Sequence, residues 1–222
     1  MRLKIIRRLE QWYGVSQIKR NGFWFVDIPR TSSTSLKVQL ASKYGKTYAK
    51  RNKKYNPRGI FNDHLSSKRM IEILSRDVWD NLFTFTIIRN PWDRAVSYYQ
   101  YSLAWHKKNR PDLRLNSFKQ HIVNLKNTYN ENTIAKRNIL LGCYEFISYD
   151  NEIVVDKVIR FENRHEELNE ISKKIGIDNL TSTHKHKTLG KKNYNEFYNN
   201  ETRRIVEEIF AKDIEEFGYS FD

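Results

Sequence analysis

Two segments of the chain share one order: an apolar run, a short polar turn, and a segment with apolar residues at helical spacing. The first contains FVDIPRTSSTSLKVQL, residues 25–40, and the second contains NLFTFTIIRNPWDRAVSYY, residues 81–99. Short apolar runs rich in aromatic and β-branched residues are typical of parallel strands buried on both faces. In the second segment Asn90 suits a helix N-cap and Pro91 suits the first helical position. Strands that alternate with helices predict an α/β fold.

The rest of the chain fits a single α/β domain, a mostly parallel central sheet flanked by helices. The chain has 222 residues, which is the range of one α/β domain or of two small ones, and with 39% hydrophobic and 14% aromatic residues we expect one domain spanning residues 1–222. The sequence FISYDNEIVVDKVIRF predicts either a hairpin that turns at Asp150–Asn151 or one strand that ends near Phe161. We expect an amphipathic helix within 1–21 and further helices near 66–74, 116–126, 163–175 and from Tyr194 onward.

The chain is strongly basic, with 40 Lys and Arg against 26 Asp and Glu and a formal net charge of +14. This surplus indicates an anionic partner, such as nucleic acid, a membrane surface, a polyanionic glycan or a phosphorylated small molecule. A soluble protein with a basic surface fits the same charge.

Cys143 is the only cysteine, which excludes an intrachain disulfide and a cysteine-based zinc site. The N-terminal sequence has no long apolar stretch, so we expect a cytoplasmic protein without a membrane span.

The first polar turn has the chemistry of an anion site. Backbone N–H groups at a helix N-terminus lack helical partners, and the helix dipole adds partial positive charge. Arg30 adds a full charge, and hydroxyl groups come from Thr31, Ser32, Ser33, Thr34 and Ser35. The GxxxxGK[ST] pattern is absent, which disfavours a Walker-type loop with its magnesium ion. A capped helix start with a surface arginine is the other interpretation.

The second polar turn offers another anion site. Arg89 leaves the apolar run just before a helix begins, and Ser97 lies about two turns into that helix, with Arg94 between them. An arginine fork with a hydroxyl suits a phosphate monoester. The alternative is that Arg89 and Arg94 pair with local acids such as Asp93. Because ligands of α/β sheets bind beyond the carboxyl ends of strands, both turns fall where a ligand is expected.

Taken together, the two turns resemble the motifs of sulfotransferases that use 3′-phosphoadenosine-5′-phosphosulfate (PAPS). IPRTSSTSL is similar to their 5′-phosphosulfate loop, P-K-T-[GA]-[GS]-T-S, and IIRNPWDRAVSYY to their 3′-phosphate element, R-x-P-x-x-R-x-x-S. The resemblance continues through DHLSSKRMIEIL, VDKVIRFEN and EEIFAKDIEEFGYSF, and is closest to the carbohydrate group, including heparan 2-O-sulfotransferase-like enzymes. It implies a P-loop-like three-layer architecture. It also implies transfer of a sulfuryl group from PAPS to a hydroxyl, with PAP as product and a carbohydrate as the expected acceptor.

The resemblance also implies roles for individual residues. His64 matches the place of the family's catalytic histidine and is the predicted general base, with Asp63 as second candidate or as its orienting partner. Arg30 stands where most members carry lysine and is expected to help the sulfuryl group depart. The implied PAPS-binding residues are Arg30, Thr31, Ser32, Ser33, Thr34, Ser35, Arg89, Ser97, Lys187 and Thr188. No metal is required. A solvated or helix-capping histidine is the other interpretation of His64, and His106, His121 and His165 are expected to be solvated.

The acceptor side matches the family poorly. Residues 45–63 and 109–138 are expected to be acceptor-side loops, and the basic residues within 46–58 suit an acidic glycan. Two other function classes account for parts of the sequence. One is a P-loop kinase or NTPase. The other is a basic polyanion-binding module on a degenerate sulfotransferase fold, an alternative that remains because Arg30 replaces the family's usual lysine. No motif for nucleic-acid recognition is present, so we expect no nucleic-acid partner. Nothing in the sequence indicates an oligomeric state.

Overall fold

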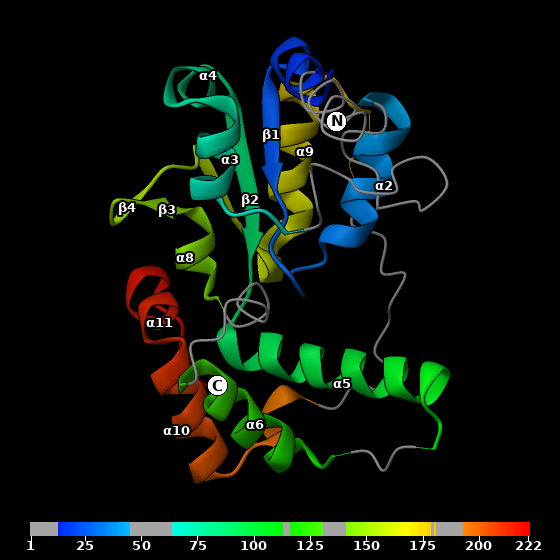
Figure 1. Cartoon of the computed structure of the whole chain (residues 1–222), viewed down its shortest axis with the longest axis vertical. Helices are drawn as coiled ribbons and strands as arrows, with labels where there is room; N and C mark the ends of the chain where they lie inside the picture. The colour runs from blue at the N-terminus through cyan, green and yellow to red at the C-terminus, as the bar shows by residue number, and fades with distance from the viewer. Residues whose placement is uncertain (1–12, 45–63, 113–115, 131–140, 179, 181–192) are drawn as a thin grey trace, which may run out of the picture. The chain divides into compact units, whose positions relative to one another are not determined.

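The computed structural model describes residues 13–44, 64–112, 116–130, 141–178, 180 and 193–222 (Figure 1). The chain packs as two compact units. Unit 1 comprises Met1–Ile88 with Phe146–Lys185, and unit 2 comprises Arg89–Glu145 with His186–Asp222. Unit 1 holds the parallel sheet, whereas the described residues of unit 2 are mainly helical.

Unit 1 is built on a parallel sheet with the strand order β1-β2-β5. The strands are β1 (Phe23–Val26), β2 (Phe83–Ile88) and β5 (Lys157–Arg160). Val26 pairs with Thr86, and Ile88 pairs with Arg160. The rings of Phe25 and Phe85 lie 5.1 Å apart in the buried core. Since the strands are parallel, the turns that follow β1 and β2 start from the same edge of the sheet. The predicted parallel α/β sheet is confirmed.

Helices cover both sides of this sheet (Figure 1). They are α2 (Ser33–Tyr44) and α9 (Arg164–Lys174) on one side and α3 (Ser67–Leu74) and α4 (Arg76–Asp80) on the other. The α3 helix begins as predicted, because the Ser66 hydroxyl accepts a hydrogen bond from the Arg69 N–H. Residues 13–21, within the predicted N-terminal helix, are helical and bury Ile18 completely.

A hairpin precedes the third strand of unit 1. It consists of β3 (Ser148–Tyr149) and β4 (Glu152–Ile153), which pair in antiparallel fashion. Asp150 and Asn151 have φ of 52° and 65°, which is typical of a two-residue type I′ turn. The hairpin alternative is therefore confirmed, and β5 forms a separate strand after it. The indole N–H of Trp79 in α4 donates to the Val154 carbonyl at 2.8 Å and fixes the hairpin to unit 1.

Unit 2 is assembled around a long helix, α5 (Pro91–Asn109). The other elements are α6 (Phe118–Asn130), a 3-10 turn η4 (Tyr194–Phe197), α10 (Asn200–Ile209) and α11 (Ala211–Phe217). The predicted cap is confirmed, because the Asn90 side chain accepts from the N–H groups of Trp92 and Asp93. Helix α6 covers the helix predicted near 116–126.

A short helix, α8 (Cys143–Ile147), spans the boundary between the two units. The Asp213 carboxylate of α11 accepts hydrogen bonds from the backbone N–H groups of Cys143 at 2.7 Å and Tyr144 at 2.8 Å. Cys143 is fully buried, and this burial, reinforced by Asp213, raises the pKa of its thiol to about 12.

Within the described residues, every helix is too short or too polar to cross a membrane.

Candidate functional site

The backbone of the turn between β1 and α2 alternates in handedness. Arg30 has φ of 68° and Ser32 has φ of 72°, whereas Thr31 between them has a negative φ. Alternation of this kind is the backbone pattern that can direct successive N–H groups toward one point, as in an anion-binding nest. A left-handed φ costs a non-glycine residue about 1–2 kcal/mol. The backbone of this turn is therefore not in its least strained conformation.

Three of the five predicted hydroxyl ligands face the interior of this turn. The buried Thr31 hydroxyl donates to the Ile28 carbonyl at 2.9 Å. The buried Ser33 hydroxyl donates to the same carbonyl at 3.4 Å, and the Ser35 hydroxyl donates to the Ser32 carbonyl at 3.3 Å. These hydroxyl groups stabilise the turn itself. Ser32 and Thr34 are only partly buried, so they are the hydroxyl-bearing side chains of the turn that reach the surface.

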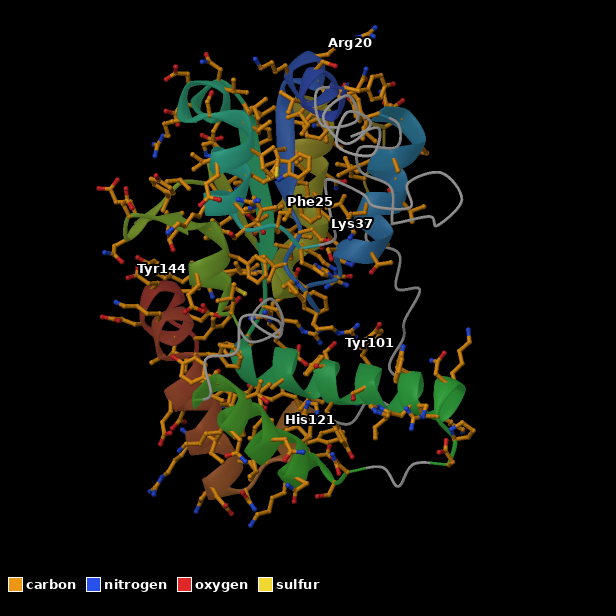
Figure 2. All side chains as sticks on the ribbon, in the orientation of Figure 1. Arg20, Phe25, Lys37, Tyr101, His121 and Tyr144 are labelled. Carbon is orange, nitrogen blue, oxygen red and sulfur yellow. The ribbon has the colours of Figure 1, made fainter. Side chains whose placement is uncertain are left out.

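His64 lies against the carboxyl end of β1. Its Nδ1 atom is 3.0 Å from the backbone oxygen of Asp27 and 3.1 Å from the carboxylate Oδ2 of the same residue. The Asp27 carboxylate also pairs with the Lys37 ammonium of α2, which Figure 2 labels on α2 beside β1. His64 has a left-handed backbone, with φ of 70°, and its side chain is 31% exposed. It is therefore a partly buried, anchored histidine, not a freely solvated one.

The Asp27 carboxylate is ionised at neutral pH. Burial alone would raise its pKa, but His64 and Lys37 outweigh burial and lower the pKa from 3.8 to about 2. Among the described residues its second oxygen, Oδ1, is buried without a hydrogen-bond partner. Neither Asp27 nor Lys37 is among the site residues that the sequence predicts. A charged residue inside the apolar run FVDI was the available signal, because a buried carboxylate requires a cation or several donors.

The second turn, between β2 and α5, carries Arg89. Its Nε atom donates to Asp93 Oδ2 at 2.7 Å, and the arginine side chain is only 13% exposed. This is the local ion pair that the sequence left open as an alternative. It also fixes the plane of the Arg89 guanidinium, because Asp93 lies one helical turn further along α5. Ser97 lies on the same helix and is buried.

Arg94 points into the interior of unit 2. Its NH2 group donates to the Leu141 carbonyl at 2.8 Å, and its NH1 group lies 3.9 Å from Asp213 Oδ2. The guanidinium also lies 5.5 Å from the centre of the Phe210 ring. Arg94 is 3% exposed and helps to pack unit 2, whereas the printed contact of Arg89 with Asp93 uses its Nε atom.

His121 is not solvated, so that expectation is wrong. Its ring lies 5.1 Å from the Tyr98 ring and 5.4 Å from the Tyr99 ring, and burial lowers its pKa to about 4. Figure 2 shows it between α5 and α6, within unit 2. His106 is partly buried, and its Nδ1 lies 2.8 Å from the Ser102 carbonyl, whereas His165 is exposed as expected.

The remaining predicted positions divide into two groups. Arg30 and His64 belong to unit 1, and Arg89 and Ser97 belong to unit 2. Asp63, Lys187, Thr188 and the loop 45–63 lie outside the described residues, as do parts of 109–138. No group of three or more His, Cys, Asp or Glu side chains arranged to hold a metal ion occurs in the described part of the chain.

Comparison with known protein families identifies the family of this chain. The family model described as "Sulfotransferase family" matches residues 16–220, which is nearly the whole chain and runs through both units. No curated protein and no solved structure matches the chain.

Proposed function

Because the chain belongs to the sulfotransferase family, we propose that it transfers a sulfuryl group from PAPS to a hydroxyl of a carbohydrate. A sulfotransferase uses a nucleotide sulfate donor and a hydroxyl acceptor. The observation that carries the finer assignment is the pairing of His64 with Asp27, three residues before the alternating turn at Arg30. A candidate base and a candidate anion nest thus come from the same end of β1.

The first turn fits the 5′-phosphosulfate of the donor. Sulfuryl transfer is an in-line displacement, in which a new bond forms between the acceptor oxygen and sulfur while the bond from sulfur to the 5′-phosphate oxygen breaks. Negative charge develops on that phosphate oxygen, and preorganised donors and cations are the most effective way to stabilise it. The Arg30 guanidinium and the N–H groups of the nest supply both. Arginine remains protonated throughout, so Arg30 stabilises charge but does not donate its proton.

His64 serves as the general base in this proposal. The proton of the acceptor hydroxyl passes to His64 Nε2 as the oxygen attacks sulfur, and general-base assistance of this kind contributes about 10²- to 10⁴-fold to a rate. The Nδ1 atom is engaged with Asp27, which leaves Nε2 as the nitrogen for proton transfer.

Arg89 and Ser97 are proposed to hold the 3′-phosphate of the donor, with Lys187 and Thr188 as further contacts. Support comes from the 3′-phosphate motif in the sequence and from the ion pair that orients the Arg89 guanidinium. A planar guanidinium of fixed orientation suits bidentate binding of phosphate. We further propose that residues 1–222 act as one sulfotransferase domain, since the family match spans both compact units.

An acidic glycan is the proposed acceptor. The net charge of +14 far exceeds what two phosphate sites require, and a uronate-containing chain is a polyanion that such a surface attracts. The resemblance to carbohydrate sulfotransferases points to the same class of acceptor.

Calorimetric titration with PAP tests the donor site. The wild-type protein is expected to bind PAP, and Arg89→Ala is expected to weaken binding by roughly tenfold to 100-fold, because a charged hydrogen bond contributes about 1.5–3 kcal/mol. Arg76→Ala is the matched control: Arg76 also pairs with an aspartate four residues later, Asp80, but is exposed and belongs to α4. No PAP binding at millimolar concentration would refute a PAPS-dependent enzyme.

Transfer of radiolabelled sulfate from PAPS across a panel of acidic and neutral glycans tests the reaction. His64→Ala is expected to reduce the turnover by about 10²-fold or more while PAP binding persists. Magnesium-dependent ATP hydrolysis without sulfate transfer would favour the kinase or NTPase alternative. Salt-dependent binding of any polyanion without PAP binding would favour the binding module.

A further inference from the structure

One nitrogen of His64 faces two oxygen atoms of the same residue. His64 Nδ1 lies 3.0 Å from the Asp27 backbone oxygen and 3.1 Å from Asp27 Oδ2. A backbone carbonyl only accepts hydrogen bonds, and so does an ionised carboxylate. An unprotonated Nδ1 would place its lone pair against those of both oxygens. The hydrogen of a neutral imidazole therefore belongs on Nδ1.

The carboxylate is held in its acceptor form by a second cation. Lys37 Nζ pairs with the same Oδ2 atom that faces His64, and both Lys37 and Asp27 are buried. Although burial opposes it, His64 and Lys37 together lower the pKa of Asp27 to about 2, so the carboxylate is an acceptor near neutral pH. Because Lys37 balances the charge of Asp27, the imidazole need not be charged to balance it. The ion pair thus presents a fixed acceptor to a neutral histidine.

We propose that Asp27, held by Lys37, is a positioning residue that keeps His64 in the Nδ1-protonated tautomer and so directs the Nε2 lone pair to the acceptor hydroxyl. Both the base and its partners come from elements that meet at the carboxyl end of β1: Asp27 follows the strand, Lys37 lies on α2, and His64 precedes α3. The catalytic meaning of this arrangement rests on the proposed function. The tautomer itself is a property of the protein and can be measured without a substrate.

Nitrogen-15 NMR of the full-length protein labelled at histidine tests the proposal. The chain has six histidines, and His64→Gln identifies the signals of His64 by their loss. Above neutral pH, the wild-type His64 is expected to show a protonated Nδ1 and an unprotonated Nε2. Asp27→Asn is expected to lower the population of the Nδ1-protonated form, because an asparagine amide can place an N–H donor against Nδ1, while the backbone carbonyl of residue 27 still favours a proton there.

Asp156→Asn is the matched control for this substitution. Asp156 is another carboxylate of unit 1, and its Oδ2 accepts from the Thr84 N–H and hydroxyl, both at 2.7 Å. Thr84 pairs with Trp24 near the start of β1, whereas Asp27 follows the end of that strand. This variant is expected to leave the His64 spectrum unchanged. An Nε2-protonated His64 in the wild-type protein would overturn the proposal, and that spectrum is decisive even if Asp27→Asn does not fold.

Kinetics separate this inference from the proposed function. With PAPS and an active glycan, Asp27→Asn is expected to lower kcat by about 10²-fold with little change in KM, as loss of a group that acts in the transition state does. A His64 spectrum as expected but no sulfate transfer would refute the function and leave the tautomer assignment standing. Sulfate transfer with an Asp27→Asn enzyme that keeps the wild-type kcat would refute the role of Asp27 and leave the function standing.

Discussion

Left-handed backbone marks the candidate site at the scale of single residues. Arg30, Ser32 and His64 have φ of 68°, 72° and 70°. The other described non-glycine residues with positive φ lie where a chain reversal explains them, at the junction after α3 and in the β3–β4 turn. Strain of this kind persists where the surrounding structure enforces it, and it is often found at binding sites.

Replacing Ser32 with glycine is expected to stabilise the protein. Glycine adopts a left-handed φ without steric cost, so Ser32→Gly is predicted to raise the free energy of unfolding by up to about 1 kcal/mol. Ser33→Gly is the control. Ser33 is the first residue of α2, and glycine within a helix costs about 0.5–1 kcal/mol. Urea unfolding of the two variants measures the difference, and equal destabilisation by both would show that Ser32 is unstrained.

Individual site residues are easier to predict from the sequence than the residues that they contact. The place of His64 in the chain predicts its role, but its pairing with Asp27 joins residues 37 positions apart and depends on how the segment before α3 packs against the end of β1. His121 was misassigned for a related reason. The helical pattern places His121 on a polar face of α6, but Tyr98 and Tyr99 of α5 cover that face.

At the scale of elements, local signals were sufficient where one segment determines its own structure. The Asn90 cap formed as the sequence predicts, and the Asp150–Asn151 turn is one of the two alternatives that the sequence offers. The hairpin and β5 could not be distinguished from one long strand, because β5 exists through its pairing with β2, which lies about 70 residues earlier in the chain.

The contact between α8 and α11 predicts a large effect of a small substitution. A Cβ atom at Gly142 would lie 2.5 Å from Asp213 Oδ1, the atom that accepts the Tyr144 N–H. Gly142→Ala is therefore expected to displace the carboxylate and to lower the free energy of unfolding by about 1–3 kcal/mol. Thermal unfolding measures it. In an Asp213→Ala background the same substitution is expected to cost much less, and an unchanged cost would contradict this mechanism.

At the scale of the whole molecule, sequence pattern predicted the α/β class and the parallel sheet but not the two compact units. Each unit is made of segments from distant parts of the chain, since residues 89–145 interrupt unit 1. Strand and helix patterns are properties of single segments and contain no information on this grouping. The net charge was available from composition, but its distribution over the surface depends on the fold.

Each unit contributes its own pH dependence to stability. In unit 1, the lowered pKa of Asp27 gives a contribution that is complete above pH 3.8 and is lost as the pH falls toward 2. In unit 2, burial lowers the pKa of His121 from 6.5 to about 4, which favours the neutral ring in the folded state. The contribution of the neutral His121 ring to the free energy of unfolding is complete above pH 6.5 and is lost as the pH falls toward 4.

Stability is thus expected to decline in two separate pH ranges. Between pH 6.5 and 4, the His121 share is on the order of 1–2 kcal/mol after allowance for partial exposure. His121→Phe is expected to flatten this decline, because phenylalanine has no charge to gain. His165→Phe, at an exposed histidine, is expected to retain it. Denaturant unfolding at pH 7, 5.5 and 4 compares the variants, and a parallel decline in all three proteins would contradict the assignment to His121.

The buried Cys143 has one last consequence. Its thiol is the only thiol of the chain, is fully buried at the start of α8, and stays protonated because burial raises its pKa to about 12. Reactivity of cysteine requires the thiolate and access to it. Thiol-directed oxidants and alkylating reagents therefore find no accessible thiolate at Cys143 while the fold is intact.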